Sequence, residues 1–398
     1  MATVVLRIFT NADTLKRIGD RYLIELFAPY SAFFAQRGLT LPATADNGGL
    51  DHEKLADIFM TPDTDMPGDL ADALFLIHEM STKEAMDKLQ TAAEELELEL
   101  GLGGDAEPAA VAVRVWLVRR TLIEEIHSEG ELARPKAFLS YLTDRNPVPD
   151  FVPPNDATRR ELEKRMDEWF EKKKRGSGCR VFIYPRGTEC WFMVRHGEPC
   201  RREGTHEQQG LSSSVFYRPQ QHDILIYDLA GGELRVHAGS QGERELYKKC
   251  FGLFVFGDEN FFPGEGKYTL KPLTRDGPAA LNCLDVEGIE WVKLREIEIQ
   301  WWGSGRGNTE REIRKANDLF VAFASREFQL KDGHDLRRAV FQVKFRDAKR
   351  PRSVTIAPSN RAKYERDGDC VFLETWFKKR GFILENGNDE ADGTLGEP

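Results

Sequence analysis

The chain has 398 residues, of which 66 are acidic and 56 basic, so its formal net charge is −10. A hydrophobic content of 40% supports packed cores and excludes a wholly disordered chain. No stretch approaches the ~20 consecutive apolar residues of a membrane helix, and the start lacks the pattern of a signal peptide. We therefore expect a cytoplasmic protein of two or three domains with no membrane partner.

Charge is unevenly distributed along the chain. Residues 1–157 carry 27 acids and 14 bases, a net of −13, which leaves 39 acids and 42 bases for the remainder, a net of +3. The last fourteen residues hold five acids and no base, so without them the second part is near +8. Such an asymmetry bears on the choice of partners rather than on the fold.

The first part has the pattern of a mainly helical domain over residues 1–144. A short strand is predicted at 4–9, followed by a helix capped by Asn11 or Asp13 and kinked near Pro29. Three further helices are expected: one opening at 67–69, one from a capping box at 81–84 to about 100, and one from 107–108 to about 130.

Residues 145–156 contain four prolines and predict an extended linker between domains. Asn155 or Asp156 then caps a charged helix that runs to Arg175, with Gly176 expected to end it. From Arg180 onward the hydrophobic pattern has a period of two, which is typical of strands.

The remaining segments indicate an antiparallel α+β domain over residues 157–385 and an acidic disordered tail at 386–398. Two hairpins are predicted, 180–184 with 190–194 and 223–227 with 233–237. The expected strands are 180–184, 190–194, 214–217, 223–227, 233–237, 268–270, 291–299 and 339–345, with helices at 243–250 and 367–379.

The segment from Trp191 to Pro199 runs from an apolar strand into Arg195, His196 and Gly197. It resembles the opening motif of the histidine phosphatase superfamily, and the resemblance implies a nucleophilic His196 with Arg195 holding phosphoryl oxygens. That family also needs a second histidine. His237 follows His196 by only 41 residues, which leaves little room for the intervening αβ units, so we interpret Arg195 and His196 as structural.

Two acid-and-base triplets are similar to the spacing in metal-dependent nucleases, whose carboxylates hold Mg²⁺. They are Glu265–Lys267 after Asp258, and Glu233–Arg235 after Asp228. The six cysteines form no C-x-x-C pair, so the sequence predicts reduced thiols and neither a metal nor a cofactor. A phosphatase-like or nuclease-like hydrolase remains the alternative interpretation.

Basic groups give the broadest signal, because cations release counterions from phosphate backbones. We interpret the protein as a non-catalytic binding or adaptor protein whose second domain contacts nucleic acid, DNA or RNA, or an acidic partner. The acidic helical domain is expected to dock a protein subunit. The candidate nucleic-acid-binding residues are Lys172, Lys173, Lys174, Arg175, Arg201, Arg202, Lys349, Arg350, Arg352 and Arg361.

Overall fold

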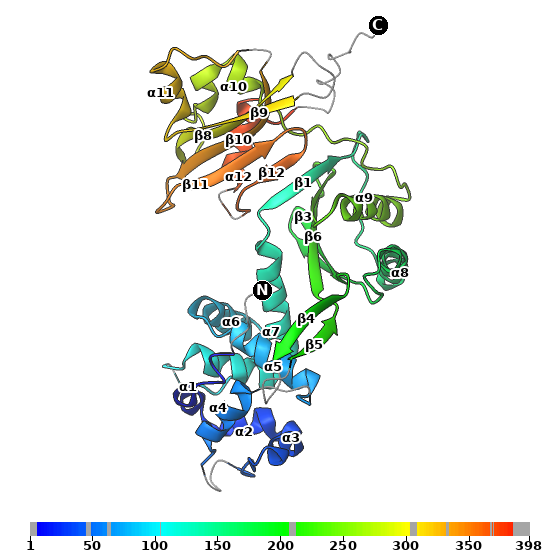
Figure 1. The fold of residues 1–398 in the computed structure, drawn as a ribbon, viewed down its shortest axis with the longest axis vertical. Coiled ribbons are helices and arrows are strands. Elements are labelled where there is room, and N and C mark those ends of the chain that lie inside the picture. Colours follow the sequence, from blue (N-terminus) through cyan, green and yellow to red (C-terminus); the bar gives the residue numbers. More distant parts are fainter. Residues whose placement is uncertain are drawn as a thin grey trace. The chain divides into compact units, whose positions relative to one another are not determined.

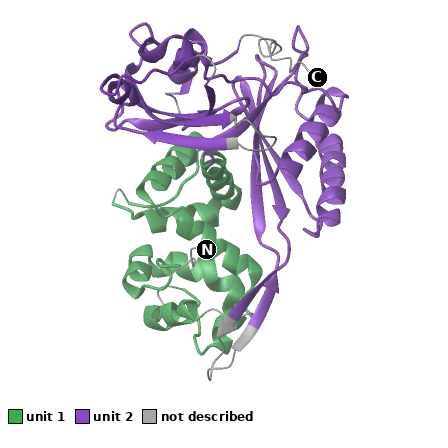
Figure 2. Cartoon of the chain, turned by 45° about the horizontal axis from the view of Figure 1, so that its top comes forward, with its two compact units in different colours: residues 1–134 green, residues 135–398 purple. Residues whose placement is uncertain are grey.

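A computed structural model describes residues 6–44, 49–61, 65–103, 105–206, 212–302, 309–331, 334–366, 368 and 370–384. The chain forms two compact units, residues 1–134 and 135–398 (Figure 2). Unit 1 is helical, and unit 2 is built on a large antiparallel sheet with helices (Figure 1). The predicted α+β class, helical first and sheet second, is confirmed.

Unit 1 packs its helices around a core rich in phenylalanine. The ring of Phe9 lies edge-on to those of Phe27 and Phe59, with centroids 6.4 and 5.8 Å apart. Such pairs add to the apolar area that the rings bury. The helices are α1 (Ala12–Ile18), α2 (Asp20–Phe27), η1 (Ala28–Tyr30), α3 (Ser31–Gln36), α4 (His52–Met60), α5 (Gly68–Glu79), α6 (Lys83–Glu95) and α7 (Pro108–Ala133).

Side-chain capping explains where three of these helices, α1, α4 and α6, begin. The Asn11 side chain accepts a hydrogen bond from the Thr14 N–H at 2.9 Å, as predicted for the start of α1. The cap of α6 is Thr82 and not Ser81, because the Ser81 hydroxyl donates to a carbonyl of the preceding helix instead. The strand predicted at 4–9 was wrong for its described part, since residues 7–10 form a hydrogen-bonded turn.

Unit 2 contains a ten-stranded sheet in the order β2-β3-β6-β7-β1-β12-β11-β10-β8-β9, and a separate two-stranded ribbon, β4-β5. Neighbouring strands in both sheets run antiparallel. The strands are β1 (Ala137–Leu142), β2 (Arg180–Arg186), β3 (Glu189–Gly197), β4 (Arg201–His206), β5 (Ser212–Tyr217), β6 (Gln220–Asp228), β7 (Glu233–His237), β8 (Ile289–Trp302), β9 (Thr309–Lys315), β10 (Asp335–Phe345), β11 (Arg352–Ala357) and β12 (Arg361–Lys363).

The helices of unit 2 are α8 (Asp156–Lys172), α9 (Gln241–Phe256), α10 (Lys271–Arg275), η3 (Gly277–Leu281), α11 (Leu319–Ala324) and α12 (Cys370–Lys379). They cover opposite faces of the two halves of the sheet. Leu139 of β1 shares a face with Val236 and belongs to the core beneath α8 and α9. On its other side, Leu139 pairs with Arg361 of β12. Ala362, the next residue of β12, faces the opposite side of the sheet and lies in the core beneath α12. The unit therefore has two cores joined by one sheet.

The division between the units falls at Arg134 and Pro135, ten residues before the boundary expected at 144. The reason is β1, which the sequence did not reveal and which pairs with β7 and β12 in the middle of the sheet. The proline-rich segment 145–156, expected to link two domains, consequently lies inside unit 2. It leads into α8, whose cap is Asn155, as predicted. The tail at 386–398 lies outside the described residues.

Candidate nucleic-acid interface

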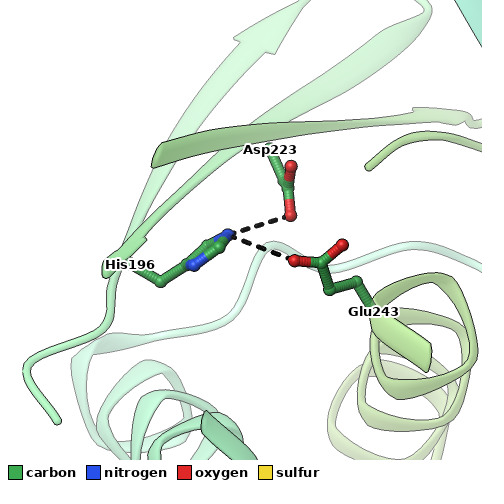
Figure 3. A group of neighbouring side chains, drawn as sticks. All are labelled: His196, Asp223 and Glu243. Carbon is green, nitrogen blue, oxygen red and sulfur yellow. Dashed lines mark hydrogen bonds and ion pairs between the residues drawn. The ribbon is translucent and has the colours of Figure 1, made fainter. Parts of the chain in front are cut away.

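The histidine singled out by the sequence sits in a buried network at the end of β3 (Figure 3). His196 is 3% exposed, and the ring of Phe170 stacks on it with centroids 4.3 Å apart. Its Nδ1 lies 3.0 Å from the Gly197 carbonyl oxygen, and its Nε2 lies 3.0 Å from Asp223 Oδ2. Both partners are acceptors, so the arrangement favours the imidazolium, in which both ring nitrogens donate.

Two carboxylates and one guanidinium complete the network. The Tyr247 hydroxyl donates to Asp223 Oδ2 at 2.7 Å, and Glu243 Oε1 lies 3.9 Å from the imidazole Nε2. Glu243 also closes the capping box of α9 with Ser240 and pairs with Arg175, which follows α8. Two negative and two positive charges therefore balance within a buried volume.

The charge of His196 depends on these neighbours. Burial by itself disfavours the imidazolium, but hydrogen bonds to Asp223 and to the Gly197 carbonyl, together with the charge of Glu243, outweigh it and raise the pKa of His196. The network thereby ties β3, β6, α9 and the end of α8 together.

His196, Asp223 and Glu243 are also donors that a divalent cation accepts, and their ligand atoms lie within 4.8 Å of one another. A cation there would have to displace the Nε2 proton and compete with Arg175 for Glu243. The charges already balance without an added ion. The donor set is thus suitable in type, but its present partners suit an ion-pair network better than a metal centre.

The structure does not bring the three phosphatase candidates together. His196 registers with Gln221 and faces α9, whereas Arg195 registers with the following residue, His222, and lies on the opposite face of the sheet. The Arg195 guanidinium lies 5.4 Å from the centroid of the Phe182 ring. His237 shares the face of Arg195, and its Nδ1 is 2.8 Å from the Ala137 carbonyl oxygen.

The nuclease-like triplets also have other partners. Lys267 Nζ donates to both carboxylate oxygens of Glu233 at 2.7 Å, and Arg235 Nε lies 3.1 Å from the same group. Asp258 accepts from Arg145 at 2.8 Å. Asp228 Oδ1 accepts backbone N–H groups of the β6–β7 turn. Cations and N–H donors therefore already bind the carboxylates that a metal would need.

The candidates Arg201 and Arg202 lie on an exposed ribbon, which we call the arm: β4 and β5, extending beyond the ends of β3 and β6 (Figure 1). Each strand of the arm has six residues, a length of roughly 17–20 Å. The Glu198 N–H donates to the Pro219 carbonyl at 2.8 Å and joins the arm to the sheet.

The two faces of the arm differ in chemistry. Arg202 is directly opposite Phe216, both are exposed, and Phe216 is 68% exposed. On the other face Arg201 pairs with Glu198, and the Tyr217 hydroxyl donates to Glu203. Within the described part of the chain, the side chain of Arg202 forms no ion pair or hydrogen bond. Among the residues described on the arm, the first face therefore presents a cation and an aromatic ring with no acid paired to them.

A second predicted cluster, Lys172–Lys174 at the end of α8, lies beside the base of the arm. The segment after α8 comes close to the end of β3 at Gly197, because a Cβ atom added there would lie 2.5 Å from the Arg175 carbonyl oxygen. Arg218, the residue directly after β5, packs its side chain over Gly176, where an added Cβ would lie 3.4 Å from the Arg218 Cδ. The fold thus joins two basic clusters that are 25 or more residues apart in sequence.

The other candidates lie elsewhere or are already paired. Arg175 pairs with Glu243, and Arg352 pairs with Glu365. Lys349 and Arg350 occupy the exposed turn between β10 and β11, while Arg361 lies beyond the opposite end of β11. The ten cations predicted from sequence therefore do not form a single face.

Sequence reasoning overlooked Phe216 and Arg218, although both follow from one signal. Phe216 and Arg218 alternate in and just after a short polar segment that follows Arg201–Arg202 by more than ten residues, which is the pattern of a hairpin partner.

Among known proteins, no family model matches the chain, and no curated protein is significantly similar to it. No helix in the described residues has the length and apolar composition to cross a membrane.

Proposed function

We propose that this protein binds nucleic acid without catalysis, and that the arm of unit 2 enters a groove of duplex DNA. The observation that carries the proposal is the pair of Arg202 and Phe216 on an exposed two-stranded ribbon whose base is flanked by Lys172–Lys174. The major groove of B-DNA is about 12 Å wide and admits such a ribbon.

Each group has a distinct role in this proposal. The lysines after α8 and Arg218 neutralise phosphates, which gives affinity with little sequence preference. Phe216 supplies an apolar surface that can contact bases or wedge between them, and Arg202 lies next to it to contact phosphate or base edges. The A-form groove of RNA is too narrow and deep for the same entry.

Unit 1 has a different role in the proposal. Its 24 acids and 12 bases give a net charge of −12, which repels phosphate. We propose that it docks a protein subunit. The six cysteines are all free thiols, and this fits a reducing, cytoplasmic location.

The test is a binding titration of the full chain on duplex DNA at two salt concentrations. Replacing Arg202 by Glu and Phe216 by Ala should weaken binding by about tenfold, because it reverses a cation that would contact phosphate or base edges and removes the apolar contact to the bases. Reversing Lys172–Lys174 to Glu should reduce the log–log salt slope by about 0.9 for each phosphate that is no longer neutralised. The control is Val215→Ser, since Val215 is 46% exposed on the other face of the arm.

Several outcomes would contradict the proposal. One is the absence of binding to duplex DNA at low salt. Another is equal binding by the control and the arm variants, which would mean that the arm is not the interface. Tighter binding to single strands or RNA would contradict groove entry. Binding to an acidic protein alone would show that the cations serve another partner.

A further inference from the structure

The ten-stranded sheet of unit 2 ends in two edge strands, β2 and β9, and the β2 edge is blocked. The Val181 N–H of β2 donates to Glu163 of α8 at 2.8 Å. The N–H of Cys179, just before the strand, donates to Asp167 of the same helix, also at 2.8 Å. Further along β2, Pro185 has no N–H to donate. These positions therefore offer no donor to a further strand.

The edge at β9 is open. The Ala316 N–H donates to the Arg295 carbonyl at 3.0 Å, directly after the register pair of Lys315 and Glu296. Backbone groups alternate in direction along an antiparallel strand, so every second residue before Ala316 also faces β8. The residues between them, which direct their N–H and C=O groups away from β8, are Arg311, Ile313 and Lys315. No residue that the structure describes bonds to these outward groups, and such an edge is a template for another chain.

The side chains of β9 complement those of a second β9 related by a two-fold axis through Ile313. Antiparallel pairing about this axis places Glu312 opposite Arg314 of the second copy, and Arg314 opposite its Glu312. The two Ile313 side chains meet at the axis, and each is 51% exposed in the single chain. Opposite charges and apolar pairs directly across two strands stabilise their pairing.

The charged groups of this pairing have room for an additional partner. Arg314 donates through Nε to Glu312 Oε1 at 2.6 Å, and within the described part of the chain its two Nη groups have no partner. Its guanidinium lies 3.8 Å from the centroid of the Phe328 ring, which holds it at the edge. Glu312 accepts from Arg314 and from Trp301 Nε1 through different oxygens, and each oxygen can accept a second hydrogen bond.

The same register sets Arg311 opposite Lys315 of the second copy, on the other face of the sheet. Acids of β8 already offset this repulsion. Arg311 lies 3.4 Å from Glu298, and Lys315 lies 2.8 Å from Glu296. The like charges therefore do not oppose the pairing as bare ions.

Other registers are less favourable. Outward groups pair with outward groups, so a two-fold axis must pass through a residue of the strand. Moving the axis by one or two residues puts a charged side chain directly opposite its own copy: Arg311, Glu312, Arg314 or Lys315. Like charges in this position are destabilising, so Ile313 is the favoured centre.

We propose that β9 pairs with β9 of a second copy of this chain, antiparallel and with Ile313 on the two-fold axis, so that two copies share one continuous sheet. Each copy contributes the same surface, as in most homodimers. The blocked β2 edge limits the assembly to two copies. The proposal is independent of the arm, which extends from β3 and β6 in the other half of the strand order.

Sedimentation equilibrium of the full chain measures the affinity of the dimer. The concentrations should run from roughly 1 to 200 μM, because an interface one strand wide gives weak association. Glu312→Arg sets two pairs of like charges across the axis and should weaken the dimer about tenfold. Adding Arg314→Glu to this variant restores the opposite charges and should restore association. The matched control is Glu310→Arg, an equal charge change at a residue that faces uncharged Ala316 of the second copy.

A mixing experiment tests the pairing of Glu312 with Arg314 directly. In a mixture of the native chain and the double variant, Arg faces Arg and Glu faces Glu across the axis. Each protein should therefore dimerise with itself, whereas a labelled double variant should not sediment with the native chain. Efficient mixed dimers would overturn the charge pairing.

Other outcomes would also overturn the proposal. One is a native chain that stays monomeric over the whole concentration range, which would leave the edge to another partner or to none. Another is a dimer that Glu312→Arg leaves unchanged. A dimer that Glu310→Arg weakens and Glu312→Arg strengthens would place the axis at Glu312. Far-UV circular dichroism checks that each variant is folded, and a folded double variant that stays monomeric would refute the pairing.

Failure of this inference is distinguishable from failure of the proposed function. The arm variant Arg202→Glu with Phe216→Ala should dimerise like the native chain. A loss of dimerisation in that variant would assign the contact between copies to the arm and overturn the role of β9.

Discussion

The buried ion pair between Glu233 and Lys267 gives the sharpest stability prediction. Lys267 donates to both carboxylate oxygens of Glu233 at 2.7 Å. The Lys267 side chain is 8% exposed and the Glu233 side chain 5%. Arg235 approaches the same carboxylate at 3.1 Å. Replacing Lys267 by Met preserves the length of the side chain and removes its charge, so Glu233 is left buried with one cation fewer.

The local charges indicate how large the effect is. Burial by itself would raise the pKa of Glu233, but Lys267 and Arg235 outweigh it and hold that pKa well below its usual range. Removing one partner of a buried pair costs about 3–5 kcal/mol, because the remaining charge stays desolvated. Glu233→Gln should cost a similar amount. The double variant should cost at least about 2 kcal/mol less than the sum, because neither charge is then left alone.

Tryptophan fluorescence can follow unit 2 in denaturant. Trp116 is the single tryptophan of residues 1–134, so a Trp116→Phe background confines the signal to residues 135–398. The four proteins of the cycle are then compared by their denaturation midpoints and slopes. Additive costs within about 0.5 kcal/mol, or a cost below about 1 kcal/mol for Lys267→Met, would refute the reasoning that this pair is a coupled, desolvated unit.

Three further predictions rest on other sites. Because folding raises the pKa of His196, its contribution to the free energy of unfolding is complete below about pH 6.5 and is lost as the pH rises through the folded pKa. The difference in stability between the native protein and His196→Gln should therefore shrink as the pH rises. An unchanged difference, or stoichiometric metal by elemental analysis, would contradict the imidazolium assignment. Gly288→Ala should cost about 1–3 kcal/mol in the same denaturation assay, since φ is +82° and a Cβ would lie 2.5 Å from the Phe372 ring, and a neutral result would contradict that clash. Burial raises the pKa of Cys190 to about 12, so a thiol reagent should modify exposed Cys200 first and Cys190 only on unfolding; the reverse order, read by mass spectrometry, would argue against this packing.

Much of the secondary structure could be predicted because its causes are local. The cap at Asn155 and the β2–β3 and β6–β7 hairpins depend on side chains and turns a few residues apart. Charged strands carry no such signal. β9 reads Thr-Glu-Arg-Glu-Ile-Arg-Lys, and its strand state comes from pairing with β8. The expected strand at 268–270 is only a bridge from Tyr268 to Ile383.

The sequence by itself determined the α+β class, the order of the two parts and the opposite sign of their charges, because composition and periodicity are properties of the chain. Tertiary structure decided which polar residues meet. It brought His196 together with Asp223 and Glu243, and it brought Lys172–Lys174 to the base of the arm. It also gathered α10, the start of β10 and the end of α12 around two adjoining hollows. These contacts join residues distant in sequence, so they follow from strand register and packing, which local patterns do not encode.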